Sequence, residues 1–112
     1  MSTPPEFDVS TETASPGVLV VRIVGELDMS TSVEVEEAIA AAPPVKRAIV
    51  DLTLCTFLDS AGVRLLLATH RRLAADGGGA QIVASDAGIR RVLEITNVST
   101  MLPLHSTLDA AL

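Results

Sequence analysis

Residues 47–62, RAIVDLTLCTFLDSAG, are the stretch that decides the fold of this chain. Residues 47–52 form a short apolar run of the kind that becomes a buried strand. Residues 53–59 then lead into a helix that we expect over about residues 60–75. Gly77 follows, and a glycine at this place is typical of the left-handed residue that ends a helix. The stretch therefore predicts a strand, a loop and a helix in succession.

Two strands are predicted upstream of this unit. Residues 17–24 are a β-branched run between Pro16 and Gly25, which indicates a mostly buried strand. Residues 6–10 alternate between apolar and polar types and indicate an edge strand. Residues 11–17 are then the hairpin loop, although they contain no two-residue turn signal.

A first helix is predicted after these strands. Ser30 and Thr31 are the candidate caps, and Thr31 with Glu34 has the spacing of a capping box. Acidic residues crowd the opening turns, where the helix dipole favours negative charge. The pair Pro43-Pro44 ends the helix, because proline cannot continue its hydrogen bonding.

The remaining elements follow residue 79. Residues 80–84 predict a strand, and Ser85 or Asp86 is placed to cap a third helix. Residues 100–104 predict a last strand, in which a proline indicates an edge or a strand end. Residues 105–112 leave room for about two turns of helix.

We therefore expect an α/β fold made of a single domain that spans residues 1–112. The predicted order is ββαβαβαβα, and helices between strands imply right-handed crossovers and a largely parallel sheet. A length of 112 residues suits one domain. The sequence contains no internal repeat and no low-complexity tract.

Charge is unevenly spread along the chain and excludes one class of partner. The formal net charge is −6. Up to Asp59 there are ten acidic and three basic residues, whereas from Ser60 onward there are four acidic and five basic residues. Nucleic-acid binding needs a basic face that neutralises phosphates, and only Phe7 and Phe57 are aromatic. We therefore expect no direct nucleic-acid partner.

The sequence carries the signals of a cytoplasmic protein. No apolar run approaches the ~20 residues that span a bilayer, so we expect no membrane partner. Residues 1–10 carry acids and prolines instead of the basic and then apolar pattern of a secretory signal. Cys55 is the only cysteine, so no internal disulfide can form. Arginine outnumbers lysine seven to one, a composition that indicates a GC-rich bacterial genome.

Residue types that usually carry catalysis are sparse. His70 and His105 are the only histidines, and with one cysteine they make no metal-ligand spacing. We expect His70 to be exposed near a helix end, and Cys55 to be a buried structural thiol. The glycine run 77–79 lacks the strand and helix context of a phosphate-binding loop. We therefore expect no metal, no cofactor and no enzymatic activity.

Ser60, in the sequence Asp59-Ser60-Ala61-Gly62, lies at the start of the predicted helix. One interpretation is structural: a serine at or near the N-cap satisfies a free backbone N–H and contributes roughly 1 kcal/mol. The other is functional: its hydroxyl accepts a phosphoryl group, because a helix N-terminus favours anions. Thr56 is a second hydroxyl in the preceding loop. The residue pattern alone favours the structural role.

Three motifs together resemble a known family. Gly-Glu-Leu-Asp at residues 25–28 follows a strand, Asp-Leu at residues 51–52 ends another, and Phe-Leu-Asp-Ser-Ala-Gly at residues 57–62 opens a helix. This combination is similar to the STAS domain, and specifically to the bacterial anti-sigma factor antagonists. The resemblance covers nearly the whole chain, including residues 106–112.

The resemblance implies a fold and a switch. It implies a four- or five-stranded mixed sheet with helices packed mainly on one face. It implies that Ser60 is phosphorylated by a partner anti-sigma factor, which is an ATP-using serine kinase. The unphosphorylated antagonist would bind this kinase and release a sigma factor, and a metal-dependent serine phosphatase would reverse the modification.

The same resemblance indicates where the partner binds. Asp28 and Asp59 match acidic positions of the motifs, beside Ser60. Arg64 follows Ser60 by one helical turn, so its charge serves a partner, pairs with Asp59, or is simply solvated. We expect the partner-binding surface to include Asp28, Asp59, Ser60 and Arg64.

Two alternatives remain open at this point. The chain could be a non-switching STAS scaffold subunit of a larger signalling or transport assembly, in which Ser60 is only a cap. A small enzyme or nucleotide hydrolase is the third possibility, which the lack of a phosphate-binding loop and of a nucleophile–base pair argues against. A mass gain on Ser60 that depends on the kinase separates the first two.

Overall fold

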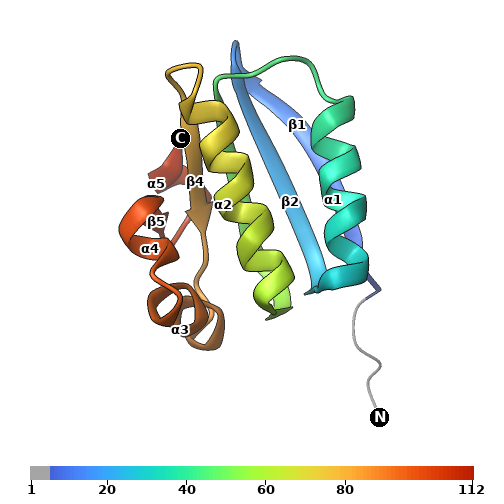
Figure 1. The fold of residues 1–112 in the computed structure, drawn as a ribbon, viewed down its shortest axis with the longest axis vertical. Coiled ribbons are helices and arrows are strands. Elements are labelled where there is room, and N and C mark those ends of the chain that lie inside the picture. Colours follow the sequence, from blue (N-terminus) through green and yellow to red (C-terminus); the bar gives the residue numbers. More distant parts are fainter. Residues whose placement is uncertain (1–5) are drawn as a thin grey trace.

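A five-stranded mixed sheet with helices packed against it is the frame of the chain (Figure 1). The computed structural model describes residues 6–112, and residues 1–5, where the predicted domain starts, lie outside that range. The elements in chain order are β1 (Asp8–Ser15), β2 (Val18–Leu27), α1 (Met29–Ala41), β3 (Arg47–Leu58), α2 (Ser60–Ala74), β4 (Gly79–Val83), α3 (Ala87–Ile95), α4 (Val98–Met101), β5 (Leu104–His105) and α5 (Leu108–Ala111).

The strands lie in the order β1-β2-β3-β4-β5. β1 runs antiparallel to β2, whereas β2, β3, β4 and β5 are parallel neighbours. Parallel neighbours need crossover connections, and α1, α2 and the α3–α4 segment supply them. Figure 1 shows α1 and α2 side by side, both beginning at the lower end of the view. The predicted α/β class with a largely parallel sheet is confirmed.

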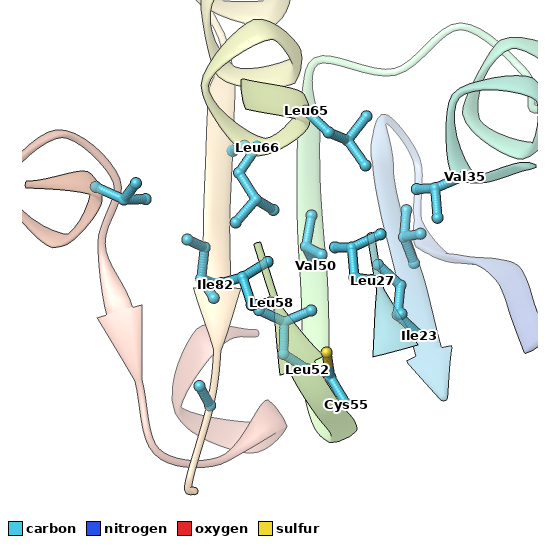
Figure 2. Packing of buried hydrophobic residues seen from close by; sticks show 14 of the residues in the cluster. Ile23, Leu27, Val35, Val50, Leu52, Cys55, Leu58, Leu65, Leu66 and Ile82 are labelled. Atoms are coloured by element: carbon cyan, nitrogen blue, oxygen red, sulfur yellow. The ribbon is translucent and has the colours of Figure 1, made fainter. Parts of the chain in front are cut away.

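Most of the core lies between the sheet and helices α1–α4. Alternate strand residues such as Ile23 and Val50 point to this side, and α2 covers them with Leu65 and Leu66 (Figure 2). Burying one such side chain contributes about 1.5–3 kcal/mol. α5 packs on the opposite face, where Ala111 joins a small second cluster. The predicted packing of helices mainly on one face is therefore confirmed.

The first hairpin differs from the sequence prediction. β1 continues to Ser15, so residues 11–17 are mostly strand and not loop. The turn consists of Pro16 and Gly17, and Gly17 adopts a φ of +78°, which suits glycine at the third position of a type II turn. The prediction was wrong because the exposed Thr, Glu and Ser residues of this edge strand have the composition of a loop.

β3 is also longer than predicted. It runs to Leu58. Residues 53–58 are therefore strand, whereas the sequence predicts a loop over residues 53–59. The register between β2 and β3 shifts between Arg22 and Val24 and again between Gly25 and Glu26. Such bulges break the alternation of buried and exposed side chains that marks a strand in a sequence.

The C-terminal part contains one helix more than the predicted order ββαβαβαβα. This additional helix, α4, buries Val98 against the main core. The strand predicted over residues 100–104 is mostly wrong, because Thr100 and Met101 belong to α4 and β5 (Leu104–His105) shares only Leu104 with that range. α5 has four residues, about one turn, instead of the two turns expected. Gly77 has a φ of +83°, as predicted for the left-handed end of α2.

Candidate functional site

The ends of β2 and β3 place two acidic residues at one edge of the sheet. Leu27, the last residue of β2, is the register partner of Leu58, the last residue of β3. Asp28 and Asp59 follow these leucines directly. The backbone N–H of Asp59 donates a hydrogen bond of 3.3 Å to the carbonyl oxygen of Leu27. The two motifs, 31 residues apart in the sequence, therefore meet.

Asp28 is the N-cap of α1. Its Oδ1 accepts hydrogen bonds from the backbone N–H groups of Ser30 and Thr31, both at 3.0 Å, and from the Ser30 hydroxyl at 2.8 Å. Thr31 Oγ1 accepts in return from the Asp28 backbone N–H at 2.9 Å. The prediction that Ser30 or Thr31 caps this helix is therefore wrong by two or three positions, and Thr31 completes a capping box with Asp28.

These donors also set the charge of Asp28. The backbone N–H of Thr31, followed by the Ser30 hydroxyl, holds the pKa of the Asp28 carboxyl below its ordinary value, because both stabilise the carboxylate form. Asp28 is therefore ionised at neutral pH and presents a fixed negative charge at the start of α1.

Asp59 caps α2 in the same way. Its Oδ1 accepts from the backbone N–H groups of Ala61 at 2.9 Å and Gly62 at 3.1 Å. Ser60 is the first residue of the helix and is exposed. Among residues 6–112, the side chain that caps α2 is that of Asp59, so the prediction that the Ser60 hydroxyl caps the helix is wrong. The hydroxyl is left on the surface.

Gly62 fixes the position of this helix start. A Cβ on Gly62 would lie 2.5 Å from Cδ1 of Leu58, a distance that real contacts do not reach. The backbone of α2 therefore approaches the strand ends more closely than any other residue type would allow. Close packing against the strand ends therefore explains the glycine of the Asp-Ser-Ala-Gly motif. This packing also holds Ser60, two residues earlier, near the strand ends.

Arg64 lies one turn after Ser60 and is exposed. In the part of the chain that the structure describes, the one salt bridge joins Arg22 and Glu12. Arg64 and Asp59 do not form the ion pair that was one of the options for this arginine. The structure thus brings Asp28, Asp59 and Ser60 to one edge and adds Arg64 on the adjoining surface of α2.

Met29 belongs to the same edge and was missed by sequence reasoning. It is the first residue of α1, directly after Asp28, and is 73% exposed. Val33, one turn further, is 50% exposed. A signal existed in the sequence, because neither residue shares the helix face of the buried Val35 and Ile39. Met29 and Val33 thus add two exposed apolar side chains to the start of α1.

Two other residues singled out in the sequence have structural roles. Cys55 is buried, burial raises the pKa of its thiol, and the thiol donates to the carbonyl oxygen of Phe57 at 3.2 Å. The expected buried thiol is confirmed (Figure 2). His70 is half-buried, and its Nδ1 accepts from the Ala80 backbone N–H at 3.0 Å. The prediction of an exposed His70 is therefore wrong, because this ring links α2 to β4.

The chain matches one protein family over most of its length. The STAS domain profile covers residues 11–111. The anti-sigma-F factor antagonist RsfB of Mycobacterium tuberculosis is 33% identical over 100 residues, which are 86% of this chain and 80% of RsfB. No helix within residues 6–112 is long and apolar enough to cross a membrane.

Solved structures give the same result. The crystal structure of an anti-sigma factor antagonist from Mycobacterium paratuberculosis superposes with a TM-score of 0.85 and 34% identity, covering 99% of this chain and 95% of that one. The unphosphorylated form of the anti-sigma factor antagonist SpoIIAA superposes with a TM-score of 0.80 and 24% identity, covering 93% and 92%. The chain belongs to the STAS-domain family and, within it, to the bacterial anti-sigma factor antagonists.

Proposed function

We propose that this antagonist is switched by phosphorylation of Ser60. In the unphosphorylated state it binds an anti-sigma factor that is a serine kinase and thereby releases a sigma factor. Phosphorylation by that kinase ends the binding, and a serine phosphatase restores it. The protein acts in the cytoplasm, without direct contact to nucleic acid and without enzymatic activity of its own.

The observation that carries the proposal is that Asp59 caps α2 while the neighbouring Ser60 does not. Asp59 supplies the cap hydrogen bonds of α2, so the helix does not need the Ser60 hydroxyl. That hydroxyl is exposed at a position that Gly62 fixes against the strand ends. A kinase needs an accessible hydroxyl, and the exposed Ser60 supplies one. This arrangement supports the switch over the scaffold alternative, in which Ser60 would serve only as a cap.

The electrostatics of the edge support a charge switch. The two backbone N–H groups nearest to Ser60 in the first turn already donate to Asp59. A phosphoryl group on Ser60 carries about −1.5 to −2 charges and would find these donors occupied by a carboxylate. The helix N-terminus therefore neutralises the new charge less than its dipole alone suggests. The added charge remains on the surface, where a partner encounters it.

The partner-binding surface in this proposal comprises Asp28, Asp59, Ser60 and Arg64, together with the exposed Met29. These residues flank the strand ends on α1 and α2 (Figure 1). Met29 offers the apolar contact that interfaces bury at their centre, and the charged residues set orientation.

Intact-mass spectrometry with the cognate anti-sigma factor and ATP tests the switch. Wild type should gain one phosphoryl group, and Ser60→Ala should gain none while it remains folded. Thr56→Ala, which removes the neighbouring exposed hydroxyl, is the matched control and should be phosphorylated like wild type. Full phosphorylation of Ser60→Ala, or an unmodified wild type with an active kinase, contradicts the proposal and favours the non-switching scaffold.

A further inference from the structure

The sheet face opposite α1–α4 is covered only in part. α5 covers it around Ile49 and Val83. Nearer to β1, the same sheet has a hollow of about 280 Å³, which we name the sheet hollow. Its lining residues come from three adjacent strands and are Ser10, Arg22, Ile23, Val24, Asp51, Thr53 and Leu54.

Asp51 is the unusual residue of the sheet hollow. It is only 9% exposed, and its Oδ1 accepts from the backbone N–H of Thr53 at 3.0 Å and from the Thr53 hydroxyl. No cation of residues 6–112 forms a salt bridge with Asp51. In that range, every side-chain oxygen that is fully buried has a hydrogen-bond partner. The hydrogen bonds of Asp51 all go to Oδ1, so Oδ2 is in contact with solvent. A carboxylate this buried is costly without a cation.

Arg22 is the neighbour that would be expected to pair with Asp51. The two residues are register partners on β2 and β3. The Arg22 guanidinium instead donates to Glu12 on β1 at 2.8 Å. Because the Arg22 guanidinium binds Glu12, no salt bridge within residues 6–112 compensates the charge of Asp51. The sheet hollow is therefore complementary to a cation.

Two apolar side chains of β3 that follow Asp51 in the sequence are exposed. Leu54 lines the hollow and is 63% exposed. Phe57 is 47% exposed and precedes the core residue Leu58. Because successive strand residues point to opposite faces, Phe57 lies on the same face as the hollow. One large exposed apolar side chain in a hollow that also contains a buried carboxylate favours an occupant with an apolar part and one positive charge.

We propose that the sheet hollow docks a polypeptide segment of a protein partner that carries a lysine or arginine beside an apolar side chain. The cationic group reaches Oδ2 of Asp51, and the apolar neighbour covers Leu54. This surface lies on the other side of the sheet from α2, so the protein has a second docking face that does not involve Ser60.

An NMR titration of the ¹⁵N-labelled protein with a capped pentapeptide, in which one lysine stands between two leucines, tests this assignment. We expect saturable amide shifts confined to the strands around Val24, Asp51 and Leu54. The same peptide with norleucine in place of lysine should bind about tenfold more weakly, because it lacks the charge pair. Equal binding of the two peptides, or shifts that avoid these strands, overturns the proposal.

Variants separate the contributions of charge and apolar contact. Asp51→Asn should reduce lysine-peptide affinity about tenfold, whereas Glu94→Gln, which removes an exposed carboxylate on α3, should not. Leu54→Ser should weaken binding of both peptides. If Asp51→Asn does not fold, Leu54→Ser still tests whether the peptide binds in the hollow. Arg22→Gln should strengthen binding, because it removes a competing cation. Weaker binding of the lysine peptide by Arg22→Gln would show that Arg22 does not compete with a bound cation, and equally tight binding of n-butylammonium alone would show a small-amine site; either result overturns the proposal.

Discussion

Gly62 lies against the backbone of Leu27, at the point where α2 begins and β2 ends. A Cβ on Gly62 would lie 3.1 Å from the Leu27 carbonyl oxygen and 3.0 Å from its Cγ. The same carbonyl oxygen accepts from the Asp59 backbone N–H. One close approach and one hydrogen bond therefore join the two motifs of the site. A change in either motif should alter the place of the Ser60 hydroxyl.

Gly62→Ala should destabilise the fold and misplace the phosphorylation site. The added methyl group meets Leu58 and Leu27, and overpacking of this kind costs about 1–3 kcal/mol. Urea unfolding should show this loss in the free energy of unfolding, and the rate of Ser60 phosphorylation should fall. Gly88→Ala, a helical glycine whose Cβ would approach only the Asp86 carboxylate, is the control. Equal stabilities of the two variants would contradict the close-packing argument.

Asp28 should contribute to stability in a pH-dependent way. Hydrogen bonds lower the pKa of its carboxyl in the folded protein, so the unfolded chain binds that proton more tightly. The contribution is therefore complete above the ordinary aspartate pKa of about 3.9 and is lost as the pH falls through the lowered folded pKa. The melting temperature of Asp28→Asn, which keeps a capping oxygen but cannot titrate, should lie below that of wild type at pH 7.

The gap between the melting temperatures of these two proteins should narrow as the pH falls below the ordinary aspartate pKa and through the lowered folded pKa of Asp28. Asp76→Asn, which removes a carboxylate from the exposed turn after α2, controls for the loss of one negative charge. A gap for Asp28→Asn that stays constant from pH 7 to pH 3 would show that the charge of Asp28 does not stabilise α1.

Arg64→Ala should weaken binding to the anti-sigma factor without unfolding the protein. The side chain is exposed and forms no salt bridge within the described residues 6–112, so its removal should change stability by no more than about 0.5 kcal/mol. Surface plasmon resonance should show faster dissociation or slower association. Arg91→Ala, an exposed arginine of α3, should bind as wild type does. Unchanged affinity of Arg64→Ala would move the interface away from this part of α2.

The sequence allowed the order of the main strands and helices to be predicted, because β2, α2 and the start of β3 follow regular apolar patterns. It also allowed the meeting of residues 25–28 with residues 57–62 to be expected, through the family resemblance. Residues 11–15 of the polar edge strand β1 and the bulged end of β3 lack such patterns, and the sequence therefore predicts loops for both. Both segments are strands because they form hydrogen bonds with β2. Such pairing cannot be recognised from the local sequence.

Some details of the site could likewise be predicted from the sequence, and others could not. Asp59 and Ser60 both have side chains that can cap a helix, and composition does not reveal which residue stands outside the first turn. The hydrogen bonds that Asp59 Oδ1 accepts from the backbone N–H groups of Ala61 and Gly62 identify Asp59 as the cap, and they exist only in the folded chain. The exposure of Met29 and the lack of a salt bridge to Asp51 within residues 6–112 likewise depend on which neighbours the fold supplies.

Ser60→Asp should bind the anti-sigma factor more weakly than wild type and keep its fold. The new carboxylate stands beside Asp59, whose Oδ1 already holds the N–H groups of Ala61 and Gly62. It therefore gains little from the helix N-terminus and faces the partner as an unpaired charge. A kinase must approach this hydroxyl closely, and like-charge or unpaired contacts at interfaces cost several kcal/mol. Circular dichroism should match wild type, because residue 60 is exposed and caps nothing.

Calorimetric titration with the anti-sigma factor measures the effect of Ser60→Asp, and comparison with the phosphorylated protein calibrates it. Aspartate carries about one negative charge against the −1.5 to −2 of a phosphoryl group, so Ser60→Asp should lie between wild type and the phosphorylated form in affinity. Ser85→Asp, an equal change at an exposed residue before α3, should bind as wild type does. Equal or tighter binding by Ser60→Asp would contradict the proposed switch. A partner whose affinity is not reduced by one added negative charge at this position is not expected to be released by phosphorylation.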